Sequence, residues 1–418
     1  MEALIRFEYE LLAVETEHDV HVMVELVLPP APEDAERTPL RLALALDRSG
    51  SMQGEKLDTV KRCARFLVDR LDARDRVALI TYDSHVDLLS SLSAPDPDRL
   101  AGLIDDITPG GMTNLSGGWL KALEELDRAD DGIRRALLLT DGLANQGVVD
   151  PGQLTAIARS SGERGVSTTT VGVGDSFAEE LLTDLSDAAG GRAWYAESVE
   201  DIPGIFAEEF DDLVAIAAQN VSIELRPGPE VQLLAVLNDY PSVAVDGGVQ
   251  VMIGDAFADQ RLRVVLRLHV PNLAALGLQQ IAEVVLRYVT VGEEVVSHQQ
   301  TLPVTVNAVS AEDAASASGD PDVSNEIVVL LAARATDEAR RLADRGEHAR
   351  AGQVLSEAAG QLRAAAPRSE KSEQLLEQAR DLQRTEAELH AHAYDAAASK
   401  RLHYRANEMK RNRRRRNE

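Results

Sequence analysis

The chain has 418 residues, 44% of them hydrophobic and only 4% aromatic, which indicates two or three domains with mainly aliphatic cores. Its one cysteine, Cys63, excludes an intrachain disulfide and a four-thiolate zinc site, and we expect it to be a small buried side chain. The net charge of −27 disfavours long-range attraction to nucleic acid or to anionic membranes, because like charges repel.

We expect a cytoplasmic location, because two kinds of targeting segment are not found in the sequence. The N-terminal stretch "MEALIRFEYE" lacks the basic start and the long apolar core of a signal peptide. No apolar run approaches the roughly 18 residues that would suggest a membrane-spanning helix.

The first predicted elements are two strands, at residues 5–9 and 20–28. Both segments alternate between apolar and polar residues, which is typical of strands with one buried face. A Pro-rich, charged connector at 28–39 follows them. Two strands are unstable on their own, so we expect them to join a sheet formed by a later part of the chain.

Between residues 40 and 215, short continuous apolar runs alternate with amphipathic helical patterns. The runs lie at 42–46, 76–82, 134–140, 167–174 and 192–196. Strands of this kind are buried on both faces, as in a mainly parallel sheet covered by helices on each side. The sequence therefore predicts a doubly wound, Rossmann-like α/β domain at 40–215.

The remaining sequence predicts strands first and helices afterwards. Apolar strands separated by turn signals such as "RPGP" and "DGG" favour a β-sandwich, which we expect to consist of residues 1–38 and 218–310 with the α/β domain inserted between them. A linker at 311–323 precedes a helical region at 324–398, which could dock a partner or a second copy of the chain. A basic tail at 399–418 ends the chain, with nine Lys or Arg and two Glu from residue 400 onward.

Three short motifs follow predicted strands of the α/β domain. "DRSGS" and "LLLTDG" each place an aspartate at the end of a strand, and "TPGGMTN" lies just before a helix. Loops at the carboxyl ends of parallel strands gather at one edge of the sheet, so these motifs can meet there. Together they supply two carboxylates and three hydroxyls, from Asp47, Asp141, Ser49, Ser51 and Thr113.

This set of hard oxygen ligands suits Mg²⁺ or Mn²⁺ and suits zinc poorly. Gly50, Gly110 and Gly111 would let the backbone turn tightly around an ion. Each motif alone is equally compatible with a helix cap or a plain turn. Their order, each after its own strand, favours a metal site.

Residues 40 to about 210 resemble a von Willebrand factor type A domain of the bacterial type. Its metal ion-dependent adhesion site uses a D-x-S-x-S motif, a separate Thr and a separate Asp, which match Asp47, Ser49, Ser51, Thr113 and Asp141 in turn. The resemblance implies that these side chains bind Mg²⁺, or else Mn²⁺ or Ca²⁺, and that a partner protein donates a Glu or Asp oxygen to the ion. "TDGLANQG" and "GVGD" are also similar to bacterial members and to the heavy chains of inter-α-trypsin inhibitor.

The resemblance also implies a rim of residues that contact the partner, for which the candidates are Arg48, Met112, Asn114 and Asn145. One departure from the family pattern is "GGMT", which places Thr113 one residue later than in many relatives. The sandwich resembles the interrupted domain of the integrin β subunit in architecture alone.

Other candidate residues carry less weight. His85 and Asp175 each follow a predicted strand near the same edge, and Asp175 is more typical of a helix cap than of a metal ligand. Trp119 and Trp194 are expected in the core.

Three functions remain open, of which a non-enzymatic, metal-dependent protein-interaction module is favoured. A Mg²⁺-dependent phosphoryl-transfer enzyme is disfavoured, because Ser49 occupies the position two residues after Asp47 where a general acid would be needed. No P-loop and no nucleophile elbow occur. The third function is a scaffold whose basic tail, "KRNRRRR", binds nucleic acid or an acidic partner, or folds back onto the acidic body.

Overall fold

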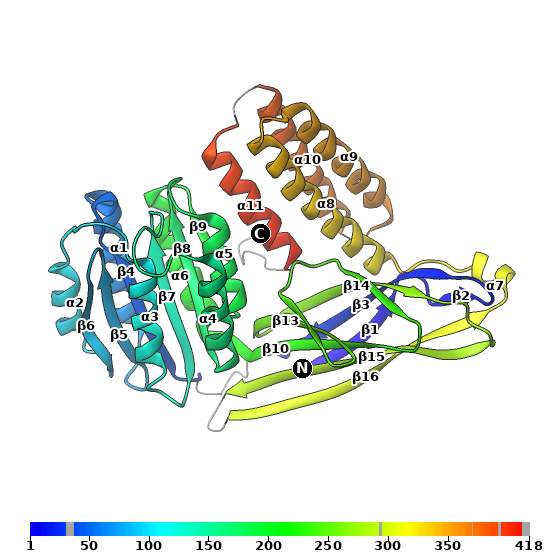
Figure 1. Cartoon of the computed structure of the whole chain (residues 1–418), viewed down its shortest axis with the longest axis horizontal. Helices are drawn as coiled ribbons and strands as arrows, with labels where there is room; N and C mark the ends of the chain where they lie inside the picture. The colour runs from blue at the N-terminus through cyan, green and yellow to red at the C-terminus, as the bar shows by residue number, and fades with distance from the viewer. Residues whose placement is uncertain (31–36, 292–294, 370, 392–393, 412–418) are drawn as a thin grey trace.

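The computed structural model describes residues 1–30, 37–291, 295–369, 371–391 and 394–411 (Figure 1). Part of the predicted connector and the four consecutive arginines of the tail lie outside these residues. The described chain forms an α/β domain, two antiparallel sheets and a group of C-terminal helices.

The α/β domain is built on a six-stranded sheet that is parallel except at one edge. The strand order is β6-β5-β4-β7-β8-β9, with β4 near the centre and β6 antiparallel to β5. The strands are β4 (Leu40–Asp47), β5 (Arg76–Tyr82), β6 (Val86–Ser93), β7 (Ile133–Thr140), β8 (Val166–Val173) and β9 (Ala193–Ala196). The parallel strands are almost wholly buried, as their continuous apolar sequences predict.

Helices cover both faces of this sheet. One core contains Leu42, Leu44 and Leu46 of β4 together with α1 (Glu55–Arg70), α2 (Pro97–Asp105) and α6 (Ile202–Val214). The opposite core contains Ala43 and Ala45 together with α3 (Leu115–Leu126), α4 (Pro151–Glu163) and α5 (Glu179–Ala188). Large and small side chains thus alternate along β4, with leucines facing one core and alanines the other. Because helices cover both faces of a mainly parallel sheet, the predicted doubly wound fold is confirmed. Trp119 and Trp194 are fully buried in these cores.

The two N-terminal strands pair with strands that follow the α/β domain. The four-stranded sheet has the order β1-β3-β14-β11, and the six-stranded sheet the order β12-β13-β10-β15-β16-β2. Their bounds are β1 (Glu2–Phe7), β2 (Leu11–Ala13), β3 (His18–Val27), β10 (Ile216–Pro227), β11 (Gln232–Val236), β12 (Ser242–Val245), β13 (Gly248–Phe257), β14 (Arg261–Val270), β15 (Gly277–Val291) and β16 (Val295–Val309). One apolar core joins both sheets, so the predicted sandwich interrupted by the α/β domain is confirmed.

Four strands differ from the expected pattern. β6 was not expected because it has no continuous apolar run, and β2 and β12 were not expected because they have only three and four residues. The stretches "VVSHQQ" and "LPVTVNAV", whose sequences indicate two separate strands, form the single 15-residue strand β16. Pro303 is tolerated within it because this part of β16 pairs with β15 on one side only, and β2 begins to pair at Asn307.

The C-terminal region contains the helices α8 (Pro321–Asp344), α9 (His348–Ala365), α10 (Ser372–His390) and α11 (Ala396–Lys410), and the predicted linker contains the short helix α7 (Ala311–Ala315). An alanine- and leucine-rich core joins α8, α9 and α10. Val323, Ile327 and Leu330 of α8 pack on Met23 and Val265 of the sandwich. In the described residues, no helix combines the length and the apolar character needed to cross a bilayer.

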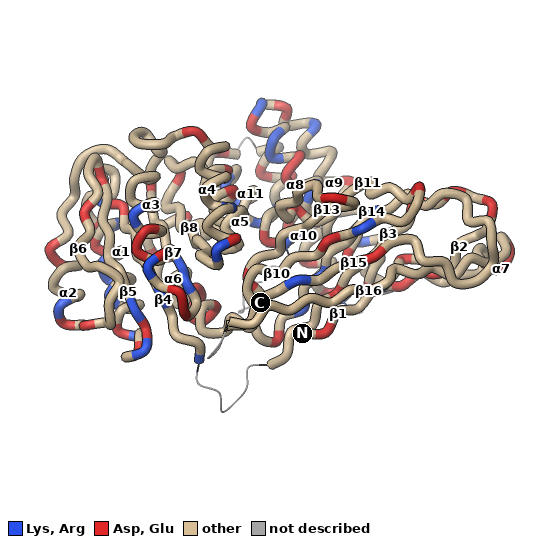
Figure 2. The backbone as a smooth tube through the Cα atoms, turned by 60° about the horizontal axis from the view of Figure 1, so that its bottom comes forward, with Lys and Arg blue, Asp and Glu red and all other residues tan. Residues whose placement is uncertain are grey.

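The predicted basic tail is helical as far as Lys410, where α11 ends. This helix lies between the α/β domain and α8 (Figure 1). Acidic residues are spread over all parts of the chain (Figure 2). Some of them form ion pairs with the basic residues of α11 and with Arg411, the residue that follows it. The ion pairs join Lys400 with Glu179 (2.5 Å), Arg401 with Glu197 (2.6 Å), Arg405 with Asp381, Lys410 with Asp239 (2.9 Å) and Arg411 with Asp187 (2.6 Å). Five of the nine basic residues of the tail are therefore folded back onto the body of the protein.

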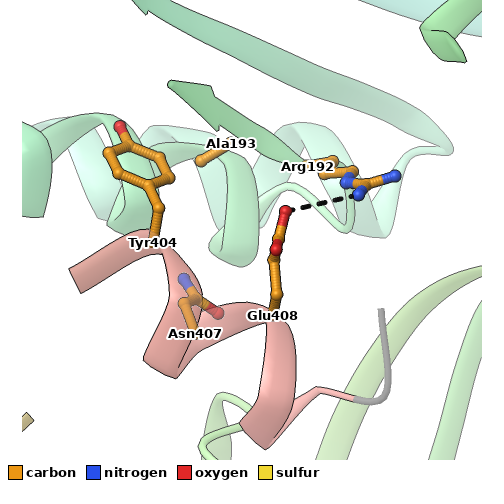
Figure 3. A pocket seen from close by; sticks show the side chains of 5 residues that line it. All are labelled: Arg192, Ala193, Tyr404, Asn407 and Glu408. Atoms are coloured by element: carbon orange, nitrogen blue, oxygen red, sulfur yellow. Dashed lines mark ion pairs between the residues drawn. The ribbon is translucent and has the colours of Figure 1, made fainter. Parts of the chain in front are cut away.

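A small hollow lies between α11 and β9, lined by Arg192, Ala193, Tyr404, Asn407 and Glu408 (Figure 3). Arg192 pairs with Glu408 across it at 3.5 Å and stacks on the ring of Trp194. On the same helix, Tyr404 stacks on Tyr195 and packs against the edge of Phe177, both in the α/β domain. These contacts hold α11 against the α/β domain at β9, the edge strand of the sheet.

The α/β domain also contacts the sandwich directly, through Gly190 and Gly254. Gly254 has a φ of +94°, and a Cβ atom there would lie 2.6 Å from the Gly190 carbonyl oxygen. Next to this contact, Arg135 pairs with Asp255 at 2.6 Å in a buried position. Only Ala215 separates α6 from β10, so the last helix of the α/β domain leads directly into the sandwich.

We predict that Gly254→Ala lowers the free energy of unfolding by about 2–4 kcal/mol, because it combines a positive φ with a backbone clash. Chemical denaturation measures the effect. Gly204→Ala in α6 is the control: a Cβ there has no neighbour within 4 Å, so the same substitution should be neutral or stabilising. Equal stability of the two variants would contradict the close contact between the domains.

We also predict a pH-dependent contribution from His403 of α11, which shares a hydrogen bond of 2.9 Å with Thr183. Burial and, to a smaller extent, the nearby Arg340 lower the pKa of His403 to about 4, against the opposing charges of Asp337 and Glu179. The unfolded chain takes up this proton near pH 6.5 and the folded chain only near pH 4. The free energy of unfolding should therefore fall by up to about 3 kcal/mol across this window as the pH is lowered.

Chemical denaturation of the wild type and of His403→Gln between pH 4 and 7.5 isolates this contribution. The difference in stability between the two proteins should be constant above pH 7 and should shift in favour of the variant below pH 6. Parallel curves over the whole range would show that His403 is not a buried neutral imidazole.

Candidate metal centre

The predicted site lies at the carboxyl edge of the parallel sheet, where β4 ends at Asp47 and β7 ends one residue before Asp141. The loop before α3 is tied to the loop after β4 by two backbone hydrogen bonds. Gly50 N–H donates to the Gly111 carbonyl (2.9 Å), and Gly110 N–H donates to the Arg48 carbonyl (2.7 Å). These bonds bring Thr113 to the end of β4.

A side chain at Gly110 would not fit in this arrangement. A Cβ atom there would lie 1.6 Å from Oδ2 of Asp83, which also accepts a hydrogen bond from Gly111 N–H at 3.2 Å. Asp83 is buried and follows β5, so the loop closes over a neighbouring strand end. Gly110 is therefore needed for a close approach of the backbone to Asp83.

The structure brings all five predicted side chains together. Ser49 Oγ and Ser51 Oγ are 3.2 Å apart, and Ser51 donates to Asp141 Oδ1 at 2.6 Å. A Cβ atom on Gly142 would lie 3.2 Å from Thr113 Oγ1 and 3.8 Å from Ser51 Oγ, which places Thr113 at the same cluster. Ser51 is exposed at the opening, whereas the other four residues are buried.

Asp47 is held by two hydrogen bonds inside the protein. Its Oδ1 accepts from Ser49 N–H at 2.8 Å, and its Oδ2 accepts from the Thr140 hydroxyl at 2.7 Å. Burial, with a smaller contribution from the neighbouring Asp141, raises the pKa of Asp47 to about 6 against the opposing effect of the hydrogen bonds. Two adjacent buried carboxylates are an arrangement that a cation stabilises.

A divalent cation fits this set of side chains on chemical grounds. In the described residues no group of three or more His, Cys, Asp or Glu side chains could hold a metal, and this cluster has two carboxylates. Any ion here would therefore have to use the hydroxyls of Ser49, Ser51 and Thr113 as well. Such all-oxygen ligation is typical of Mg²⁺ and Mn²⁺.

The four predicted rim residues have different positions. Met112 is exposed, with 52% of its surface accessible. Arg48 pairs with Asp87 at 2.6 Å and with Asp83 at 3.5 Å, so its charge is directed to the β5–β6 turn. Asn114 caps α3 by accepting from Gly117 N–H, and Asn145 accepts from Thr113 N–H at 3.0 Å. Asn114 and Asn145 thus support Thr113 and α3.

Three residues of the site were missed by sequence reasoning. Thr140 anchors Asp47, and Leu143 is an exposed apolar residue (56%) beside the cluster. Lys56, in the first turn of α1, places its Nζ 2.6 Å from Asp141 Oδ2. Thr140 and Leu143 flank Asp141 in "LLLTDGLAN" and could have been found as its neighbours, whereas nothing in the sequence pairs Lys56 with Asp141.

The weaker candidates are exposed side chains or a core residue. The side chain of His85 is 84% exposed, and Asp175 is exposed while Ala178 is the N-cap residue of α5. Cys63 is buried in α1, and burial raises the pKa of its thiol to about 11, which makes it a packing residue.

Residues 42–208 match the family model of the von Willebrand factor type A domain. The chain therefore contains a von Willebrand factor type A domain. This match covers the whole site, from the motif after β4 to Asp141, and it ends within α6.

Several curated proteins resemble longer parts of the chain. It is 26% identical to an uncharacterised protein of Synechocystis sp. over 346 residues, which are 79% of this chain and 80% of that protein. It is 28% identical to the uncharacterised protein YfbK of Escherichia coli over 48% of this chain, and 24% identical to the E3 ubiquitin-protein ligase WAV3 of Arabidopsis thaliana over 78%. The aligned regions span 39% of YfbK and 43% of WAV3, which is less than half of either protein.

Two solved structures share the architecture beyond the α/β domain. A von Willebrand factor type A protein from Catenulispora acidiphila superposes with a TM-score of 0.73 and 16% identity, over 90% of this chain and 88% of that chain. The ArnB paralog VWA2 from Sulfolobus acidocaldarius superposes with a TM-score of 0.67 and 17% identity, over 98% of this chain and 97% of that chain. At these identities the likeness shows the fold alone.

We predict that Gly142→Ala weakens Mn²⁺ binding about tenfold or more, because its methyl group would point at the hydroxyls of Thr113 and Ser51. Gly102→Ala in α2 is the control, since a Cβ there has no neighbour within 4 Å and the residue lies outside the predicted motifs. Isothermal titration of Mn²⁺ into both variants measures the effect. Unchanged affinity in Gly142→Ala would place the ion elsewhere.

Proposed function

We propose that this protein is a non-enzymatic, metal-dependent protein-interaction module. The observation that carries the proposal is the cluster of oxygen side chains at the carboxyl edge of the sheet, in which two buried carboxylates lie beside three hydroxyls. The residues proposed to hold the divalent cation, Mg²⁺ or else Mn²⁺ or Ca²⁺, are Asp47, Ser49, Ser51, Thr113 and Asp141.

A bound divalent cation with few charged ligands would keep enough positive charge to bind a carboxylate oxygen of a partner's Glu or Asp. The chain's own residues prepare such a contact. The carboxylates are buried and fixed, while Ser51 is exposed, so the cluster opens to solvent on the serine side. Met112 and Leu143 lie exposed beside it and offer apolar surface to the same partner.

The surroundings of Asp47 support a binding role over phosphoryl transfer. A nucleophilic carboxylate needs an accessible oxygen, but both oxygens of Asp47 accept hydrogen bonds and the side chain is fully buried. The residue two positions later is Ser49, which cannot act as the general acid such chemistry needs. We therefore propose that no reaction is catalysed at this site.

The basic tail has less support as a second binding site. Five of its basic residues are paired with acidic groups of the same chain, and the arginines at 413–416 lie outside the described residues. Binding of nucleic acid or of an acidic partner would have to rest on those arginines. Docking of a partner or a second copy on the C-terminal helices also stays a prediction.

Affinity capture from a native lysate tests the proposed function. We expect a partner to be retained by the full-length chain with Mg²⁺ and to be lost with EDTA or with Thr113→Ala. Ser91→Ala, at an exposed position on β6, is the matched control and should behave as the wild type. Retention that is indifferent to EDTA and to Thr113→Ala, or a wild-type chain that does not bind Mg²⁺ or Mn²⁺ in a direct titration, would overturn the proposal.

A further inference from the structure

Lys56 lies outside the predicted motif, yet it contacts a fully buried carboxylate of the cluster. Its Nζ is 2.6 Å from Oδ2 of Asp141, whose side chain is 0% exposed, whereas the lysine side chain is 33% exposed. The ammonium group also lies near the end of β8, since a Cβ atom on Gly174 would be 3.9 Å from Nζ. Lys56 therefore reaches the cluster from the α1 side.

The two oxygens of Asp141 face different neighbours. Oδ1 accepts a hydrogen bond from the Ser51 hydroxyl at 2.6 Å, on the side of the hydroxyl cluster. Oδ2 accepts from Lys56. The lysine therefore neutralises the charge of Asp141 without taking the oxygen that faces the other predicted ligands.

We propose that Lys56 is a built-in counter-ion of the metal centre, which lowers its affinity for the cation and raises its affinity for an anionic partner group. This inference rests on the proposed function and concerns the strength and selectivity of the same site. Before a cation binds, Lys56 offsets the repulsion between the Asp47 and Asp141 carboxylates, so the cluster is preformed.

The formal charges explain the proposed selectivity. Two carboxylates, one ammonium group and one divalent cation leave a single positive charge at the loaded site. One carboxylate of a partner neutralises this charge, and a neutral amide or hydroxyl cannot. Without Lys56 the loaded site would be neutral, and its preference for a carboxylate would be weaker. Lys56 thus favours Asp or Glu over Asn or Gln at the contact.

Lys56→Met removes the charge and keeps the length of the side chain. We expect this variant to bind Mn²⁺ about tenfold tighter than the wild type in an isothermal titration, because a nearby positive charge has been removed. Lys56→Arg keeps the charge and should bind Mn²⁺ with nearly wild-type affinity. If Lys56 were a purely structural ion pair, Lys56→Met would leave the affinity unchanged or weaken it.

A second measurement separates charge from structure. Ca²⁺ and Tb³⁺ have similar sizes but different charges, so repulsion by Lys56 acts more strongly on Tb³⁺. The ratio of Tb³⁺ affinity to Ca²⁺ affinity should therefore rise about threefold in Lys56→Met, and a local loss of structure would weaken both ions alike. Lys56→Gln replaces Lys56→Met in both assays if the melting temperature of the latter is lowered.

The outcomes distinguish this inference from the proposed function. If the wild type binds Mn²⁺ and the neutral variants bind it no tighter, the counter-ion role is overturned and the metal centre stands. If the neutral variants bind Mn²⁺ and the wild type binds neither Mn²⁺ nor Mg²⁺, the repulsion by Lys56 is supported and the proposed function of the native chain is overturned. If neither binds any of the three ions, both the metal centre and the role of Lys56 are overturned.

Discussion

The pairing of β3 with β14 is the constraint on which the rest of the architecture depends. Ten consecutive residues, His18–Val27, pair in register with Arg261–Val270, although the whole α/β domain lies between them in the sequence. This pairing closes the sandwich core and holds both ends of the α/β domain against one rigid body. The contact of Gly190 with Gly254, the buried pair of Arg135 with Asp255, and the docking of α8 on Met23 and Val265 all require that core.

Much of this organisation could be predicted from the sequence, for reasons that differ between elements. Buried parallel strands such as β4 and β7 have continuous apolar runs, and the polar residue that ends each run is the one that reaches the site. Asp47 and Asp141 could thus be assigned together by position alone. The strand β6 could not, because its exposed edge tolerates the serines of "LLSSLS" and leaves no apolar run to detect.

The elements that sequence reasoning missed depend on contacts between distant residues. The helix α11 has few apolar positions, and its charges are neutralised by Glu179, Asp187 and Asp239, which lie far away in the sequence. Within the sequence these charges are typical of a solvated tail. Lys56 is a similar case, because a lysine in the first turn of a surface helix normally points into solvent, and only the fold shows that Asp141 lies within reach.

The direct passage from α6 to β10 has a mechanical consequence. The long strands of the sandwich's six-stranded sheet run away from the α/β domain along the long axis of the molecule (Figure 1). Within this sheet, β10 is hydrogen-bonded to β13 on one side and to β15 on the other. A pull on the α/β domain would enter β10 at Ile216, along the direction of the strand. The hydrogen bonds on both sides of β10 then share this force in shear, rather than opening one after another.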